Sequence, residues 1–441
     1  MSKTPSLADA KWLRARPLRK LFKAIAKAGG EARVAGGAVR NTIMGLPVHE
    51  VDVATTLSPE AVTTACAAAG LSVHPTGIDH GTVTVVADHH PYEVTTLRHD
   101  VETDGRWAKV AYTNDWQADA MRRDFTMNAL YCDEDGKVYD YTNGYRDALR
   151  KRIIFVGDPR QRIQEDYLRI LRFFRFHARF GKGQPDEAGL AACVDLARGL
   201  DILSPERIRQ EMFKLLEADQ AVRTLKLMHR VGILSHLIDY KEEWWVLERL
   251  PADSVLRLAV LAADPVSMQA RWRLSNAEGK RIEAIHDSPA PTPAMSPREQ
   301  RIMLYRTGAE TWRDLVCVAW ARSDAPMDDR RWKSMLRLPD RWPIPKLPVT
   351  GRDLIDLGVA PGPKLGATLR RIEDGWMASD FQLGKSELLA RLNTCGRFAC
   401  SDSLPGRCAS CCCRRWHGRK SNRRRSATGP APAMTIPARR R

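Results

Sequence analysis

The hydrophobic positions in the first 150 residues change from a helical period to a strand period. In residues 18–30, Leu18, Leu21, Phe22 and Ile25 recur at helical spacing, and Gly29-Gly30 ends the run. Short segments that alternate or are rich in β-branched residues then follow in close succession. They are residues 32–35, 49–56, 81–87, 92–98 and a hairpin at 128–141 around Asp135-Gly136. The first 150 residues are therefore predicted to be mixed α/β.

The pattern changes after Asp158-Pro159. The segments at 165–180, 205–218 and 221–234 are amphipathic at helical spacing, and no convincing strand follows up to about residue 395. Proline-rich stretches at 289–297 and 339–348 are natural joints between helical subdomains. The pattern predicts an α+β fold, with a mixed β-sheet and flanking helices in an N-terminal head and an all-α neck, body and tail after it.

Charge changes this picture at the C-terminus. The formal net charge of the 441 residues is +17, and twelve Lys and Arg against one Asp lie from Cys395 onward. The rest of the chain is only mildly basic. A basic balance fits a polyanionic partner, although a basic tail can also be merely solvated. No run of about 18 apolar residues and no secretory signal appear, so we expect a cytoplasmic protein with no membrane segment.

The cysteines fall into two groups. Cys66, Cys132, Cys193 and Cys317 lie among apolar residues and are predicted to be buried free thiols. The other six cluster in the C-terminal tail, without two clean C-x-x-C pairs. A zinc site formed by these cysteines remains an alternative interpretation. A disordered appendage is favoured because the tail has almost no aliphatic residues that could pack.

Two patterns in the head are candidates for phosphate and metal chemistry. Gly36-Gly37, between a strand and a helix, would let the backbone approach a phosphate, with Arg40 close by. Glu50 and Asp52 are predicted to share one face of a strand, where their repulsion would be relieved by divalent metal. The two glycines would also occur in an ordinary strand-to-helix turn. The two carboxylates would also occur on a solvated strand edge.

Three further patterns could complete a site. Glu93 could project from a neighbouring strand toward the same metal. Of the adjacent Arg122 and Arg123, one could reach a triphosphate while the other pairs with Asp124. In a helix predicted to begin near residue 163, Glu165, Arg169 and Arg172 would share one face with Asp166 on its flank. Such carboxylates and guanidinium groups can bind the edge of a base, or simply pair with each other at a surface.

In this order the motifs are far more specific than any one alone. GGAVR, EVD, HGTVTVV, YEVTTLR, RRDFTMNAL, EDYLRILRFFRF and SPERIRQEMFKLL resemble the bacterial class II CCA-adding tRNA nucleotidyltransferase and poly(A) polymerase family of the DNA polymerase beta superfamily. The resemblance is strong over about residues 30–220, resumes weakly at 349–366 and does not cover the tail.

The resemblance implies roles for individual residues. It matches Glu50 and Asp52 to the metal-binding carboxylates, with Mg²⁺ as cofactor, and leaves Glu93 as a possible third catalytic acid. His80, Gly81 and Thr82 match a motif without a sharp chemical role. The implied nucleotide-binding residues are Gly36, Gly37, Arg40, Arg122, Arg123, Glu165, Asp166, Arg169, Arg172 and Arg175. The chain departs from the usual pattern, which has Asp at Glu50 and Asp at Asn41.

The implied function is addition of CCA to the 3′ end of tRNA from CTP and ATP, with release of pyrophosphate. Related CC-adding, A-adding and poly(A)-synthesising enzymes share this head. The region at 71–86 has few basic residues, which favours tRNA over poly(A) synthesis, and the segment at 99–115 has the full length expected for complete CCA addition. A phosphohydrolase is disfavoured because His286-Asp287 is the only such pair in the helical part.

These expectations divide the chain into four parts. Residues 1–157 would form the nucleotidyltransferase head, or palm, and 158–225 a neck that selects the nucleobase. Residues 226–394 would form a body and tail that bind the tRNA acceptor arm by shape and phosphate contacts. Residues 395–441 would be the Cys/Arg-rich appendage. The oligomeric state is not predicted.

Overall fold

The computed structural model describes residues 6–78, 81–104 and 107–395. One compact unit holds the described residues up to Leu347 together with Met377–Phe381, and a second holds Pro348–Trp376 and the described residues from Gln382. The predicted 395–441 appendage lies, apart from Cys395, outside the described residues. The predicted free thiols Cys66, Cys132 and Cys193 are buried, and Cys317 is half-buried.

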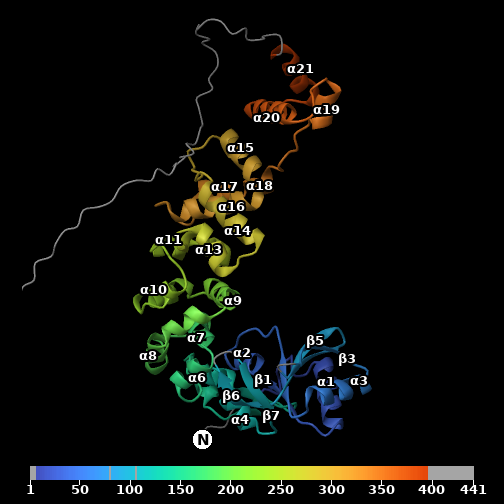
Figure 1. Ribbon diagram of the computed structural model, residues 1–441, viewed down its shortest axis with the longest axis vertical. Coiled ribbons are helices and arrows are strands. Elements are labelled where there is room, and N and C mark those ends of the chain that lie inside the picture. The colour runs from blue at the N-terminus through green and yellow to red at the C-terminus, as the bar shows by residue number, and fades with distance from the viewer. Residues whose placement is uncertain (1–5, 79–80, 105–106, 396–441) are drawn as a thin grey trace, which may run out of the picture. The chain divides into compact units, whose positions relative to one another are not determined.

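The head is built on a seven-stranded mixed sheet in the order β3-β4-β5-β2-β1-β8-β9 (Figure 1). Its strands are β1 (Ala32–Ala35), β2 (Asp52–Thr55), β3 (Ser72–Gly77), β4 (Thr82–Ala87), β5 (His90–Thr96), β8 (Leu130–Cys132) and β9 (Val138–Asp140). Its helices are α1 (Arg16–Lys27), α2 (Gly37–Ile43), α3 (Pro59–Ala68), α4 (Trp116–Met121) and α5 (Gly144–Arg150), with a 3₁₀ turn at Thr126–Asn128. Strand β2 pairs antiparallel with β1 but parallel with β5.

The two faces of this sheet have different roles. Val53 and Val94 belong to one hydrophobic core, which also holds Leu21 and Ile25 of α1. Because side chains alternate along a strand, the neighbours of these valines project to the opposite face. Helix α3 begins at Pro59, and the preceding Ser58 caps it by accepting a hydrogen bond from the backbone N–H of Ala61. The face opposite the core is thus left for the site.

The segment at 99–115 folds largely as a separate hairpin of β6 (Arg98–Asp104) and β7 (Trp107–Tyr112). After β9, the described residues form helices and no further β-strand, which confirms the predicted α+β organisation. In the first unit these are α6 (Pro159–Glu165), α7 (Leu168–Phe180), α8 (Glu187–Asp195), α9 (Pro205–Leu216), α10 (Ala221–Arg230), α11 (Trp244–Arg249), α12 (Ser254–Leu261), α13 (Pro265–Trp272), α14 (Asn276–Asp287), α15 (Pro297–Thr307), α16 (Ala309–Ala321), α17 (Arg330–Leu336) and α18 (Leu338–Arg341), with 3₁₀ turns at Ala197–Ile202 and Leu234–His236.

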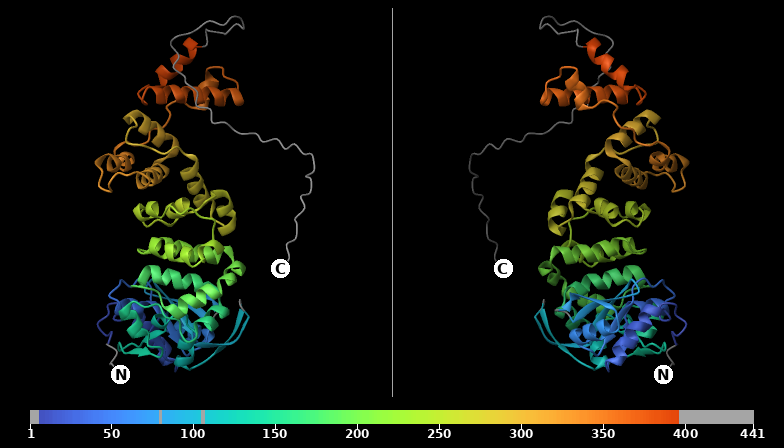
Figure 2. Two further views of the ribbon diagram at one scale, coloured as in Figure 1. Left: turned by 90° about the vertical axis from the view of Figure 1, so that its left-hand side faces the viewer. Right: turned by 90° about the vertical axis from the view of Figure 1, so that its right-hand side faces the viewer.

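Helices α9 to α16 follow one another as layers in chain order (Figure 2). Helix α7 joins them to the head through aromatic contacts, since Phe173 stacks on Phe155 and Phe155 packs against Phe125. The remaining helices are α19 (Gly351–Asp356), α20 (Pro363–Ala378) and α21 (Lys385–Cys395). No helix in the described ranges has the length and apolar composition needed to cross a bilayer.

Candidate active site

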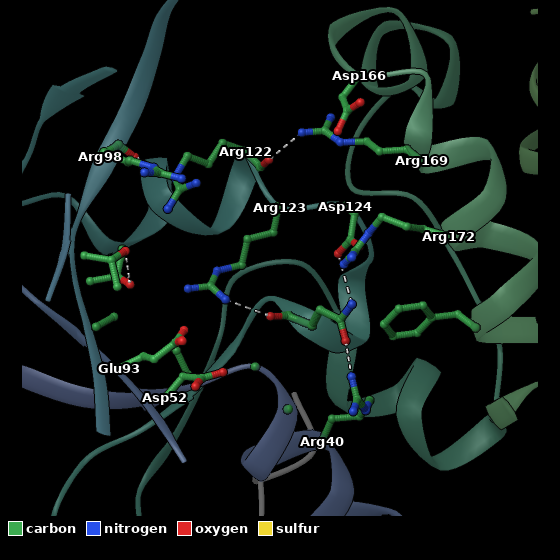
Figure 3. Close-up of a pocket in the computed structure, with 18 of the residues that line it drawn as sticks. Arg40, Asp52, Glu93, Arg98, Arg122, Arg123, Asp124, Asp166, Arg169 and Arg172 are labelled. Atoms are coloured by element: carbon green, nitrogen blue, oxygen red, sulfur yellow. Dashed lines mark hydrogen bonds and ion pairs between the residues drawn. The ribbon is translucent and has the colours of Figure 1, made fainter. Parts of the chain in front are cut away.

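A cavity of about 530 Å³ lies between the sheet of the head and helices α7 and α9 (Figure 3). Ten of the thirteen residues predicted for the site line it: Gly36, Gly37, Arg40, Asp52, Glu93, Arg122, Arg123, Asp166, Arg169 and Arg172. Glu50, Glu165 and Arg175 are not among the lining residues. The fold therefore gathers residues that are up to 136 positions apart in the sequence around one space.

Asp52 and Glu93 are the two carboxylates on the sheet wall of this cavity, and Figure 3 shows them side by side. In the parallel pairing of β2 with β5, Val53 is the partner of Val94. Asp52 and Glu93 directly precede these partners, so they are neighbours across the two strands. Burial within the cavity walls, then the charge of Glu93 and of Glu50, raises the pKa of Asp52 to about 6. The site thus holds a surplus of negative charge at this wall.

Glu50 lies differently from the prediction. Strand β2 begins at Asp52, so Glu50 precedes it and strand alternation does not place both carboxylates on one face. Glu50 is exposed, although its charge acts on Asp52. The described residues contain no ready-made cluster of three metal-ligating side chains.

The glycine turn brings the main chain to the cavity. Gly36 has a φ of 66°, a left-handed conformation that favours glycine. A Cβ on Gly36 would stand 3.3 Å from both Nη1 of Arg123 and the carbonyl oxygen of Asn128. The close approach of this turn to the second arginine motif therefore depends on glycine.

Arg40 is held from two sides. Its Nη1 donates to Oδ1 of Asn128, and its Nε and Nη2 donate to Oδ1 of Asn41, at 3.1 and 2.8 Å. Burial lowers the pKa of Arg40 to about 10. Asn41 also donates to the carbonyl oxygen of Pro47, at 2.9 Å. The departure from Asp at this position keeps the hydrogen bonds to Arg40 but removes a negative charge beside it.

Asp119 on α4, which was not among the predicted residues, organises the double arginine. Oδ1 of Asp119 accepts from Nε and Nη2 of Arg122, at 2.8 and 2.6 Å, and Oδ2 accepts from Nη2 of Arg123, at 3.1 Å. The Tyr131 hydroxyl adds a bond of 2.6 Å. Burial alone would raise the pKa of Asp119, but Arg123, Arg122 and Tyr131 together lower it to about 2. The spacing of three and four residues along a helix was the available signal.

The predicted pairing of one of these arginines with Asp124 is wrong. Asp124 instead accepts from Nε and Nη2 of Arg172, at 2.8 and 2.5 Å, and from the side-chain amide of Asn128, at 3.0 Å. Since Asn128 also binds Arg40, a continuous chain of polar contacts runs from Arg40 to Arg172 along one wall of the cavity (Figure 3).

The predicted single helix from residue 163 onward is interrupted. Helix α6 ends at Glu165, Asp166 has extended backbone with φ −157° and ψ 105°, and α7 begins at Leu168. Glu165 still pairs with Arg169, with Oε2 at 2.6 Å from Nη1. Because of the break, Asp166 faces the cavity next to Arg169 instead of lying on a helix flank.

Arg207 on α9 is a second site residue that was not predicted, although it lies in the SPERIRQ segment of one of the motifs. It lines the cavity, and its Nη2 donates to Oδ2 of Asp166, at 2.7 Å. Arg175, by contrast, is not among the residues that line the cavity and forms an ion pair with Glu211, with Nε and Oε2 2.5 Å apart. Arg175 was predicted to continue the nucleotide-binding face of the helix, but it is not part of the cavity wall.

A mixed-sheet head with paired carboxylates facing a group of arginines is the architecture of a nucleotidyltransferase. Residues 32–154 match the family model described as the poly A polymerase head domain, and residues 184–243 match one described as a probable RNA and SrmB-binding site of polymerase A. The chain is similar to CCA tRNA nucleotidyltransferase 1, mitochondrial, of Danio rerio, at 36% identity over 82% of this chain and 87% of the relative.

Two further comparisons agree. The CCA-adding enzyme of Limosilactobacillus fermentum is 31% identical over 83% of this chain and 94% of its own length. The crystal structure of the Bacillus stearothermophilus CCA-adding enzyme in complex with CTP superposes with a TM-score of 0.74 at 27% identity, covering 87% of this chain and 99% of the other. The chain belongs to the class II CCA-adding enzyme and poly(A) polymerase family, which confirms the resemblance seen in its motifs.

Proposed function

We propose that this chain adds CCA to the 3′ end of tRNA, taking CTP and ATP and releasing pyrophosphate. The observation that carries the proposal is the cavity in which Asp52 and Glu93 face Arg40, Arg122 and Arg123. The wall of arginines suits a triphosphate, and the wall of carboxylates suits the cations that accompany it. The CCA-adding relatives that match over most of their length favour CCA over the poly(A) alternative.

The residues present fit magnesium. Carboxylate oxygens are the donors that magnesium prefers. Burial, and after it the charges of Glu93 and Glu50, raise the pKa of Asp52, and a divalent cation would offset both costs of ionising it. Asp52 and Glu50 would hold the metal, as the family motif implies, with Glu93 beside Asp52. The chemistry that bound magnesium supplies is activation of the attacking hydroxyl and neutralisation of charge on the departing pyrophosphate.

The chain's own side chains would do the positioning. Arg40, Arg122 and Arg123 would bind the triphosphate, while Asp119 holds the last two in place. Asp166 and Arg169 would bind the edge of the base, with Glu165 orienting Arg169. Because most groups are already held by hydrogen bonds, they would need little reorganisation when the nucleotide binds.

The direct test is incorporation. The protein is incubated with tRNA that lacks its last three nucleotides, with CTP, ATP and Mg²⁺, and the products are sequenced. We expect CCA ends on tRNA alone. Products ending in CC would indicate a CC-adding enzyme, and products with a single added A would indicate an A-adding enzyme. Homopolymeric A tails on unrelated RNA would overturn the tRNA proposal. The cytoplasmic location stays a prediction; the Danio rerio relative is named a mitochondrial enzyme.

A further inference from the structure

A second hollow lies on a side of the head that the nucleotide proposal leaves without a role. It is a groove of about 520 Å³ between the C-terminal half of α1, the connection from α3 to β3 and the turn between β4 and β5. None of the described residues that line it also lines the cavity. Figure 1 shows α1 and α3 on the opposite side of the head from α6 and α7. The groove is therefore separate from the candidate active site.

The rim of this groove is basic. Helix α1 contains no Asp or Glu, and its Lys20, Lys23 and Lys27 line the groove at spacings of three and four residues, which places their Cβ atoms about 5–6 Å apart on one side of the helix. Lys20 pairs with Asp88, the one acidic residue among those that line the groove. Lys23 and Lys27 are exposed, and neither ammonium group forms a hydrogen bond or an ion pair with another described residue. Their two charges are available to an anionic partner.

The groove also has an apolar part. Ala24 and Leu71, which are buried, and Val86, which is half-buried, line it together with the exposed Ala69. A hollow of several hundred Å³ with apolar lining and a few charged groups is typical of a site that takes an organic group, not only an ion. The lysines and the apolar lining together therefore suit a ligand with phosphates and a flat apolar surface.

Two other partners fit this face less well. A basic amphipathic helix can bind an anionic membrane, but it does so by inserting its apolar face into the lipid. The apolar residues Leu18, Leu21 and Ile25 of α1 are fully buried in the core of the head, so none of them is available for insertion. A single phosphate would use only one part of a line of cations that extends for about 10 Å along the helix. A chain of phosphates uses the whole line.

We propose that this groove binds single-stranded RNA. Lys23 and Lys27 pair with neighbouring phosphates of the backbone, and an unpaired base enters the apolar part of the groove. A duplex keeps its bases stacked inside, so it can reach the lysines but cannot fill the groove. The groove thus gives the protein a second RNA contact, outside the cavity, for a segment of RNA other than the end that is extended. The inference goes beyond the proposed function, and binding at the groove does not require nucleotide addition.

The salt dependence of RNA binding tests the role of the lysines. The full chain is titrated with a fluorescent oligouridylate whose 3′-phosphate prevents extension, and anisotropy gives the affinity at several salt concentrations. Each phosphate of a single strand that a lysine neutralises contributes about 0.7 to the slope of log affinity against log salt. We expect the double variant Lys23→Ala/Lys27→Ala to lower this slope by about 1.4. Its loss of affinity relative to the unaltered protein should then shrink about sevenfold between about 50 and 200 mM salt.

A matched control separates the groove from net charge. Arg146→Ala/Arg150→Ala also removes two exposed cations four residues apart on one helix of the head, α5, and neither arginine lines the groove or the cavity. This variant should keep the salt slope of the unaltered protein. A slope that falls equally in the lysine and arginine variants would overturn the inference.

A variant that changes shape but not charge tests the place of the base. Ala69→Leu adds bulk at an exposed position of the groove lining and leaves every lysine in place. It should lose affinity for the oligouridylate with an unchanged salt slope, and keep the affinity of the unaltered protein for a blunt RNA duplex. Unchanged binding of the oligouridylate by Ala69→Leu would overturn the inference. Binding to phosphatidylserine vesicles that depends on Lys23 and Lys27, without such dependence for RNA, would overturn it in favour of a membrane.

Discussion

Arg172 of α7 donates two hydrogen bonds to a single carboxylate oxygen of Asp124, from Nε and Nη2 at 2.8 and 2.5 Å. The contact joins the first long helix after the head to the segment that follows the double arginine. Asp124 is 9% exposed, and although burial raises its pKa, Arg172 and Asn128 bring it below its usual range. The wall of the cavity is thus part of what holds head and neck together.

Removing this carboxylate should be costly. Asp124→Ala removes both hydrogen bonds that hold Arg172 and leaves it only the 3.8 Å ion pair with Glu211, so we expect a loss of about 3 kcal/mol in the free energy of unfolding. Urea denaturation measures it. Asp195→Ala is the control, since its ion pair with Arg160 is about half exposed on both sides and is worth about 0–1 kcal/mol. Equal losses in the two variants would contradict the structural role given to Asp124.

Asp119 should act on nucleotide binding without touching the nucleotide. Asp119→Asn removes the charge that holds Arg122 and Arg123, and hydrogen bonds to charged groups are worth about 1.5–3 kcal/mol. We expect the KM for CTP and ATP to rise about tenfold, with the KM for tRNA little changed. Asp115→Asn, at the start of the same helix, is the control because Asn caps a helix as well as Asp. A selective effect on tRNA would refute this role.

Base choice should depend on the break between α6 and α7. Arg169→Ala removes a donor beside Asp166, so the preference for CTP and ATP over UTP and GTP should fall at least tenfold. Glu165→Gln, which keeps the side chain but weakens its hold on Arg169, should show a smaller effect in the same direction. Competition among the four nucleotides, followed by sequencing, gives the ratios. Arg179→Ala, at the exposed end of α7, should keep the original preference.

Magnesium should stabilise the protein more at pH 8 than at pH 5.5. The pKa of Asp52 is raised to about 6, so without metal its ionisation removes stability as the pH rises through that value. Metal binding needs the ionised form and offsets the repulsion from Glu93 and Glu50. The shift of the thermal midpoint on adding Mg²⁺ measures the effect at each pH. Asp52→Asn should abolish the pH dependence of this shift, together with nucleotide addition; a shift that is equal at both pH values would remove Asp52 from the metal site.

Much of the fold was predictable because its signals are local. The glycines at 36 and 37 and the proline after Asp158 mark element boundaries through backbone constraints that act within a few residues. The amphipathic period likewise marked the helices after the head. Pairing across the sheet is not local, so the sequence alone could not show that the strand of Glu93 lies directly beside that of Asp52.

The errors have a common physical cause. Periodicity alone cannot show that Asp166 leaves the helix, because extended backbone at one residue hardly disturbs the pattern around it. Nor can it rank the possible partners of an arginine, so Asp124 was predicted as the partner of the double arginine where the structure has Asp119. Arg207 pairs with Asp166 across 41 positions, a contact that only the packing of α9 on α7 creates.

The parallel pairing of β2 with β5 has a consequence for how the enzyme matures. Asp52 and Glu93 are separated by a helix and two strands, and they meet only once β5 has docked along β2. Closing so long a loop costs entropy that local hairpins avoid. Local helices and the β4–β5 hairpin can form before this docking, but the two carboxylates cannot meet until β5 lies along β2. A head in which β5 has not docked along β2 therefore lacks the carboxylate pair of the proposed site.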